Sequence, residues 1–204
     1  MFRRFALFVT FVLTLLTVST FAHAQDKPDE FLVNVSNQVL EVIKDNRESY
    51  SETPDVLETA LLNTLEPAVD FNAFSRGVMG RYYKEATTEQ REKFVTAFKD
   101  TLIELYTQGL VSTEVDDIRI EDTNIRSPKS ATVTMEVTSK SENSYSIQYS
   151  LRKAEATSWK IRNIIANGVN VGLTYRNQFK SAMETEDGNL ERVIAIWPQI
   201  IGNG

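Results

Sequence analysis

Residues 71–110 read FNAFSRGVMGRYYKEATTEQREKFVTAFKDTLIELYTQGL, and this stretch decides the fold. Thr87 and Gln90 match a capping box, which predicts that a long helix begins near Thr88. Apolar side chains then recur at spacings of three and four, which places them along one helical face: Phe94, Phe98, Leu102, Leu105 and Tyr106. A shorter apolar stripe precedes the cap. The stretch therefore predicts two helices that meet at a short turn.

Two glycines, Gly77 and Gly80, lie in the shorter of these helices. A glycine inside a helix costs about 1 kcal/mol relative to alanine, so it usually marks a close approach to the backbone. Two interpretations stay open here: packing of one helix against another, or a ligand bound against the turn.

The flanking sequence predicts an α+β fold. Two helices come first, over Asp29–Lys44 and Val56–Leu65, and two more follow Gly168 and Asp187. Between them the hydrophobic period changes to two, which predicts four strands joined as antiparallel hairpins: Val115–Asp122, Ser130–Ser139, Ser144–Lys153 and Ser158–Ala166. One face of this four-stranded sheet is apolar, so helices are expected to cover it.

Residues Met1–Ala24 have the pattern of a secretory signal peptide. Arg3 and Arg4 precede an apolar run, and Ala22-His23-Ala24 resembles a cleavage site. A transmembrane anchor is the alternative, but polar residues follow at once and favour cleavage after Ala24. We therefore expect an exported, periplasmic protein whose single domain spans 25–204.

Charge and composition exclude several functions. The 204-residue chain has a net charge of −6, and cleavage would remove Arg3 and Arg4 to leave −8. This acidic balance argues against nucleic acid as a partner. The chain has no cysteine, and its one histidine, His23, lies in the expected signal peptide. The mature protein would thus lack catalysis by Ser-His-Asp or Cys-His, and any metal bound by His or Cys.

Two segments resemble the MlaC family, also known as toluene-tolerance auxiliary proteins. The first matches an apolar-Gly-Arg-Tyr-Tyr element, an Ala-Thr turn and an aromatic helix: Gly80, Arg81, Tyr82, Tyr83, Ala86, Thr87, Gln90, Arg91, Phe94, Phe98 and Tyr106. The second is NGVNVGLTYRNQFKSAM, residues 167–183. The family usually has Asp near position 163 and often Glu near 167, where this chain has Asn163 and Asn167.

The resemblance implies a function and a fold. The function is a periplasmic phospholipid carrier between an outer-membrane lipoprotein complex and an inner-membrane ABC transporter complex of the Mla type, which maintains outer-membrane lipid asymmetry. The fold is a cystatin-like curved sheet with a helical lobe and a lipid cavity between them. Phospholipid would be the cargo, and no cofactor is expected.

We expect the mouth of the cavity where the helix of Gly77–Tyr83, the apolar face of the sheet and Gly168–Val171 converge. The predicted contacts of the lipid tails are Val78, Tyr82, Phe98, Leu102, Tyr106, Ile147, Tyr149, Val169, Val171, Tyr175 and Phe179. Arg81 and Arg91 are candidates for contact with a phosphate or with an acidic patch of a partner.

Two other functions remain open. Aromatic residues at helical spacing fill an ordinary core as readily as they line a cavity, so the chain could be a periplasmic interaction or assembly module with a solid core and no lipid. A hydrolase that uses Asp116, Asp117 or Glu184 is a weaker alternative, because these carboxylates lie at expected element boundaries.

Overall fold

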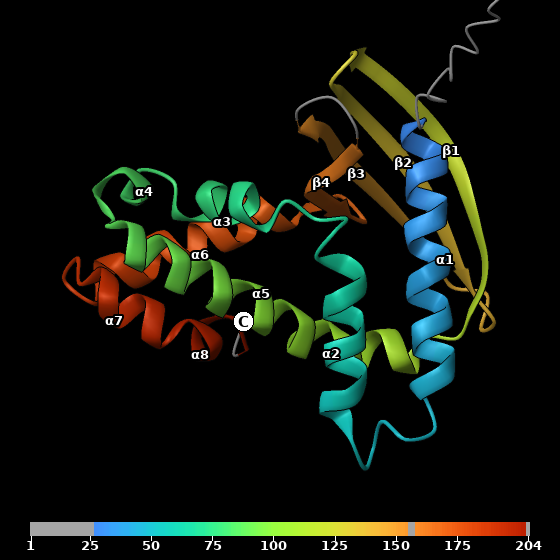
Figure 1. Ribbon diagram of the computed structural model, residues 1–204, viewed down its shortest axis with the longest axis horizontal. Helices are drawn as coiled ribbons and strands as arrows, with labels where there is room; N and C mark the ends of the chain where they lie inside the picture. The colour runs from blue at the N-terminus through green and yellow to red at the C-terminus, as the bar shows by residue number, and fades with distance from the viewer. Residues whose placement is uncertain (1–26, 155–157, 203–204) are drawn as a thin grey trace, which may run out of the picture.

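The structure, a computed structural model, describes residues 27–154 and 158–202, so the expected signal peptide Met1–Ala24 lies outside the described residues. Its elements form a helical lobe and a sheet (Figure 1). The helices are α1 (Pro28–Asn46), α2 (Pro54–Leu65), α3 (Phe71–Met79), α4 (Tyr82–Glu85), α5 (Thr88–Ser112), α6 (Val171–Thr185), α7 (Leu190–Ala195) and α8 (Trp197–Gly202). The strands are β1 (Val115–Ser127), β2 (Ser130–Ser139), β3 (Ser144–Ala154), β4 (Ser158–Ala166) and β5 (Val169–Asn170).

The predicted capping box sets the start of α5. The Thr87 hydroxyl accepts a hydrogen bond from the Gln90 backbone N–H at 3.1 Å, and the Gln90 side chain accepts one from the Thr87 N–H at 3.0 Å. These bonds satisfy two backbone donors that a helix otherwise leaves free. The helix therefore begins at Thr88, as the sequence predicts.

The shorter helix of the hairpin divides at Gly80. This residue has φ +57°, a conformation that favours glycine, and its N–H bonds to the Arg76 carbonyl to close α3. Gly77, in contrast, is exposed, and no atom beyond its own helix lies within 4 Å of a side chain added there. Of the two glycines, only Gly80 marks a turn.

The sheet is antiparallel throughout and its strands follow chain order, β1 to β5. The four expected strands form, but β1 continues to Ser127, five residues beyond the predicted end at Asp122. A fifth strand follows β4 through Asn167 and Gly168, whose φ angles are +46° and +82°. Two positive φ angles fit the tight hairpin turn that Asn-Gly favours, so Asn167 has a conformational role.

Among the described residues, the buried apolar side chains form three groups. The largest fills the space between α3, α5, α6, α7 and α8, and its centre is aromatic: Phe94, Phe98, Phe179 and Trp197 are each 0% exposed. A second joins α1 to the apolar face of the sheet, and a third joins α1 to α2. In Figure 1, α5 runs from the helical lobe towards α1 and the sheet and so connects the two. The α+β prediction is confirmed, with five strands in the sheet.

The expected last helix is divided into α7 and α8 at Ile196. Pro198 follows two residues later and has no N–H for a continuous helix. Within the described residues, no helix combines the length and apolar character needed to cross a membrane.

Candidate functional site

The apolar stripe of α5 leaves the protein core halfway along the helix. Phe94 and Phe98 are 0% exposed, whereas Leu105, Tyr106 and Leu110 are 38%, 47% and 37% exposed. The helices that pack over the first half leave these three side chains partly exposed, although Tyr106 still bonds to Tyr175 of α6. The apolar stripe of an amphipathic helix normally faces the protein core. The second half of α5 is thus one wall of a partly open apolar surface.

The sheet contributes a second apolar surface. Met135 pairs with Ile147, and Val133 pairs with Tyr149, so these side chains share the face that α1 covers in part. Met135 and Val133 are buried, while Ile147 and Tyr149 are half-buried. Burial raises the pKa of the Tyr149 phenol to about 12, because the apolar surroundings disfavour the charged form.

The β5–α6 corner carries exposed apolar side chains. Val169 is 59% exposed and Leu173 is 53% exposed, and Val171 between them is half-buried against the helical core. Exposed apolar side chains that form a contiguous patch commonly mark a binding surface. The corner is a third apolar surface near the start of α6.

Hydrogen bonds of two asparagines fix this corner. Asn163 accepts from the Gly172 backbone N–H at 3.1 Å and donates to the Asn170 side chain at 3.0 Å. Asn170 in turn caps α6 by accepting from the Leu173 N–H at 3.0 Å. A methyl group at position 172 would lie 2.4 Å from Asn163 Oδ1, so glycine is required there. Asn163 uses both its donor and its acceptor, which an ionised Asp could not do.

The eleven predicted tail contacts fall into distinct environments. Val78, Phe98, Tyr175 and Phe179 lie in the buried helical core, and Tyr82, Leu102 and Val171 pack against its edge. Ile147 and Tyr149 lie on the sheet, whereas Tyr106 and Val169 are exposed. The hydroxyls of Tyr106 and Tyr175 are 2.6 Å apart and form a hydrogen bond between the exposed set and the buried core.

Three side chains exposed on these surfaces are not among the predicted contacts: Leu105, Leu110 and Leu173. Leu105 was recognised as part of the α5 stripe, but helical periodicity does not tell where a stripe stops being covered. The two predicted cations, Arg81 and Arg91, lie beside Tyr82 and Tyr83 at the opposite end of α5. They do not join the three apolar surfaces.

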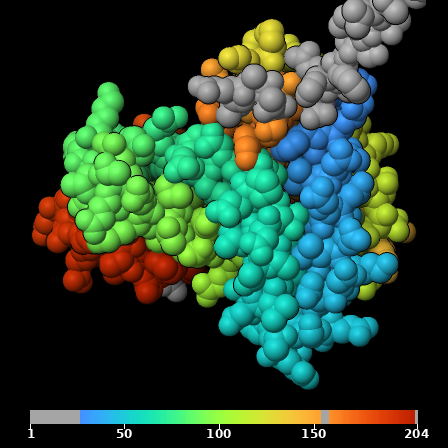
Figure 2. Space-filling model, in the orientation of Figure 1, coloured from blue at the N-terminus to red at the C-terminus, as the bar shows by residue number. Residues whose placement is uncertain are grey.

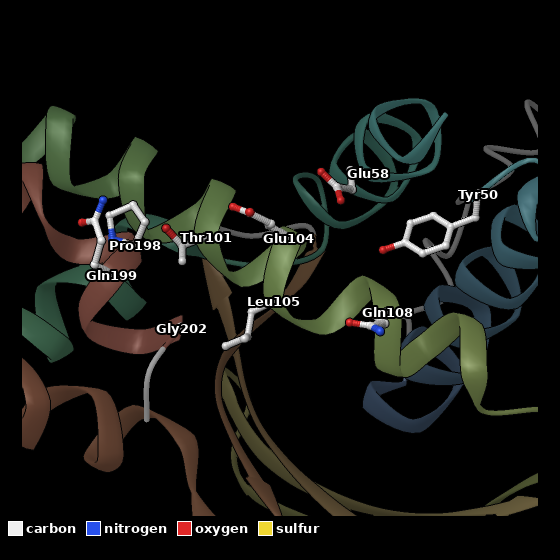
Figure 3. A pocket seen from close by; sticks show the side chains of 9 residues that line it. All are labelled: Tyr50, Glu58, Thr101, Glu104, Leu105, Gln108, Pro198, Gln199 and Gly202. Carbon is white, nitrogen blue, oxygen red and sulfur yellow. The ribbon is translucent and has the colours of Figure 1, made fainter. Parts of the chain in front are cut away.

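A pocket of about 580 Å³ lies along α5 and shares Leu105 with the apolar stripe (Figure 3). Its walls come from α2, α5, α8 and the α1–α2 connection, and its lining is mostly polar: Tyr50, Glu58, Thr101, Glu104, Leu105, Gln108, Pro198, Gln199 and Gly202. The pKa of Glu58 is raised by burial, then by the nearby charges of Glu104 and Asp55. Two carboxylates make this pocket a poor site for acyl chains, and it contains none of the eleven predicted contacts.

Across residues 27–154 and 158–202, no three His, Cys, Asp or Glu side chains are grouped so that they could hold a metal ion. Asp116 and Asp117 are both exposed at the start of β1, and Glu184 pairs with Lys180 on the surface of α6. These carboxylates do not converge on a common site.

Known proteins show the same sequence pattern and fold. The family model described as "MlaC protein" matches residues 33–199. Toluene tolerance protein ttg2D of Pseudomonas putida is 32% identical over 196 residues, which span 96% of this chain and 88% of that protein. The intermembrane phospholipid transport system binding protein MlaC of Haemophilus influenzae is also 32% identical, over 113 residues that span 55% of this chain and 53% of that protein.

A solved structure extends the likeness to the fold. It is the phospholipid-binding protein from Ralstonia solanacearum in complex with a phospholipid. The alignment covers 85% of this chain and 96% of that chain, with a TM-score of 0.75 and 20% identity. The family model covers most of the described residues, and the first relative spans nearly the whole chain. This chain therefore belongs to the MlaC family.

Proposed function

We propose that this protein binds a phospholipid by its acyl chains, which lie between the second half of α5, the apolar face of the sheet and the β5–α6 corner. The observation that carries the proposal is the change along the α5 stripe, from 0% exposure at Phe98 to 47% at Tyr106. Membership of the MlaC family and the phospholipid bound to the Ralstonia solanacearum protein support this choice of ligand.

Among the predicted contacts, we propose that Tyr106, Ile147, Tyr149, Val169 and Val171 touch the acyl chains. Each of them is exposed or half-buried. The remaining members of the set lie in the helical core or pack against it, so they support the wall from behind, and tails reach them if the helical core opens on binding. They are Val78, Tyr82, Phe98, Leu102, Tyr175 and Phe179.

The size of the hydrophobic effect explains why such a ligand needs an apolar cleft. Burial of one methylene is worth about 0.8 kcal/mol, so exposure to water of two chains with roughly thirty methylenes costs about 25 kcal/mol. Tails must therefore lie against apolar walls, while the polar headgroup remains in solvent. This binding needs no catalytic residue, and we infer that the protein is a carrier and not an enzyme.

We propose that the carrier works in the periplasm, after export and cleavage behind Ala24. It would exchange phospholipid with an outer-membrane lipoprotein complex and an inner-membrane ABC transporter complex of the Mla type. The name of the Haemophilus influenzae relative, a binding protein of an intermembrane phospholipid transport system, supports this role. The direction of transfer would follow the relative affinities of the two complexes for the lipid.

Native mass spectrometry of protein purified from the periplasm without detergent tests the proposal. We expect a stoichiometric adduct with the mass of a two-chain phospholipid. The variants Leu110→Glu and Val169→Glu place a charge on two of the proposed walls and should lose this adduct, because a carboxylate is costly to bury beside acyl chains.

Val56→Glu is the matched control, because Val56 is 53% exposed on α2, away from the three proposed walls. It should keep the adduct. Apoprotein that takes up no lipid from vesicles would contradict the proposal and favour an interaction module with a solid core. Equal loss of lipid from all three variants would contradict the placement of the site.

A further inference from the structure

Cationic side chains gather at the corner between α3 and α4, near the start of α5. The group consists of Arg76, Arg81, Lys84, Arg91 and Arg176, which we call the arginine corner. Arg91 and Tyr106 are 15 positions apart on α5, which corresponds to about 22 Å along the helix axis. Figure 2 shows this end of the molecule opposite α1.

The turn at Gly80 brings the arginines together from different elements. A methyl group at Gly80 would lie 3.0 Å from Nε of Arg176, so the absence of a side chain lets the α6 guanidinium approach the α3–α4 backbone. Arg76 lies in the last turn of α3, and Arg81 directly follows Gly80 at the start of α4. Together with Arg91 on α5, four helices thus place their charges around this bend of the chain.

Two tyrosines hold three of the guanidinium groups in place. Arg81 lies 4.8 Å from the ring centre of Tyr82 and donates to its hydroxyl at 2.8 Å. Arg91 lies 4.4 Å from the ring centre of Tyr83 and donates to the Tyr83 carbonyl at 2.9 Å, while Arg76 lies 6.0 Å from the same ring. These contacts restrict the side chains before any ligand binds, which lowers the entropy lost on binding.

None of the five cations forms an ion pair with a carboxylate in the described part of the chain, where nine of the fifteen other lysines and arginines do. The chain has a net charge of −6, so without these five charges the remainder would carry −6 − 5 = −11. Glu85 and Glu184 lie close enough to Arg81 to act on its charge, but neither forms an ion pair with it, so guanidinium donors remain free for an external anion.

We propose that the arginine corner is a docking surface for an acidic segment of a partner protein. Arginine and tyrosine are the residues that most often anchor protein–protein interfaces. Rigid guanidinium forks suit discrete carboxylates, to which they bind through paired hydrogen bonds. A membrane surface fits less well, because Tyr82 and Tyr83 are half-buried beneath guanidinium groups and the large exposed apolar side chains lie elsewhere.

Binding of a fluorescein-labelled deca-glutamate peptide, followed by fluorescence anisotropy in 100 mM NaCl, tests this surface. At this salt concentration the Debye length is about 10 Å, so local charges dominate over the net charge of the chain. The test variant is Arg81→Glu/Arg176→Glu, and both side chains are exposed. We expect its affinity for the peptide to be at least tenfold lower than that of the unchanged protein.

The control variant is Arg126→Glu/Lys129→Glu, at the end of β1 and in the β1–β2 turn. Both of its residues are exposed and have no ion pair among the described residues, and the variant changes the net charge by the same amount. It should bind the peptide within twofold of the unchanged protein. Equal weakening by both variants would overturn the proposal, because it would mean that net charge alone controls binding.

Two further measurements separate docking from lipid binding and from membrane attachment. The Arg81→Glu/Arg176→Glu variant should keep its phospholipid adduct and its melting temperature, and loss of the lipid would assign the corner to the lipid site instead. If folding suffers, Arg81→Gln/Arg176→Gln replaces it. Binding of the unchanged protein to phosphatidylglycerol vesicles but not to the peptide would also overturn the proposal.

Discussion

The hydroxyls of Tyr106 and Tyr175 lie 2.6 Å apart and connect α5 to α6 where the buried aromatic core gives way to the exposed half of α5. Their environments differ, since Tyr106 is 47% exposed and Tyr175 is 5% exposed. Burial, and then the bond to Tyr106, raise the pKa of Tyr175 above its usual value. The hydrogen bond therefore joins a solvent-exposed tyrosine to a buried one.

This asymmetry predicts unequal effects of the two hydroxyl deletions. Tyr106→Phe leaves the buried Tyr175 hydroxyl without its partner and should lower the free energy of unfolding by about 1–2 kcal/mol. Tyr175→Phe leaves only the exposed Tyr106 hydroxyl, which water can satisfy, and should cost less than about 1 kcal/mol. Urea unfolding of both variants measures the difference.

The double variant completes the cycle. Tyr106→Phe/Tyr175→Phe should be less destabilised than the sum of the two single variants, because no buried hydroxyl is then left unpaired. Additive losses would show that the bond does not couple the helices.

A second prediction concerns the contact between Asn163 and Gly172. Gly172→Ala should lower the free energy of unfolding by about 1–3 kcal/mol, because its methyl group would lie 2.4 Å from Asn163 Oδ1. In an Asn163→Ala background that obstacle is absent, so the same change should cost less. Phe74 also lies 3.2 Å from the added methyl group, so the loss of stability should be smaller but not abolished.

The comparison of Gly172→Ala in the two backgrounds by thermal denaturation checks this coupling. Gly77→Ala is the matched control, since nothing outside its own helix lies within 4 Å of the added methyl group there. It should raise stability, by up to about 1 kcal/mol. Destabilisation by Gly77→Ala as large as that by Gly172→Ala would rule out the steric explanation.

The pocket lined by Glu58 and Glu104 gives a prediction about the pH dependence of stability. Burial and the charges of Glu104 and Asp55 raise the pKa of Glu58, so the folded protein binds a proton there more readily than the unfolded chain does. The stability linked to Glu58 should therefore increase as pH falls from neutral through the raised pKa, and it is absent above that range. Glu58→Gln should stabilise the protein at pH 7, by up to about 0.5 kcal/mol.

Melting temperatures at pH 7 and pH 5 provide the measurement. The gain on acidification should be smaller in Glu58→Gln than in the unchanged protein. Glu48→Gln, at an exposed position outside the pocket, should change neither value. A larger gain on acidification in Glu58→Gln would reverse the expected sign and refute the assignment.

Local signals in the sequence predicted most of the fold. Thr87 and Gln90 fixed the start of α5, and alternation of apolar residues located β2 and β4 at their observed bounds. Elements that depend on tertiary contacts were harder to predict from the sequence. Strand β5 has only two residues, too few for a pattern, although Asn167-Gly168 is a hairpin signal.

The candidate site was less predictable than the fold, for a physical reason. Phe98 and Tyr106 belong to the same helical stripe and have the same periodicity, yet one is 0% and the other 47% exposed. What separates them is the extent of the helices that pack over α5, which depends on contacts far apart in the sequence. Asn163 shows the same limit, because its role depends on Gly172 across the β5–α6 corner.

The last prediction uses Tyr149 on the apolar face of the sheet. Burial raises its pKa to about 12, whereas a tyrosine in the unfolded chain titrates near pH 10. Between these values the unfolded state releases its proton first, so stability falls as pH rises from about 10 to 12. Tyr149→Phe removes this contribution and should reduce the loss of unfolding free energy between pH 9 and pH 11 by about 1 kcal/mol.

Urea unfolding at both pH values measures this loss, with Tyr145→Phe on the same face of β3 as the control. Equal losses in Tyr149→Phe and the unchanged protein would mean that the phenol reaches water, and the sheet would then offer acyl chains a wetter wall than proposed.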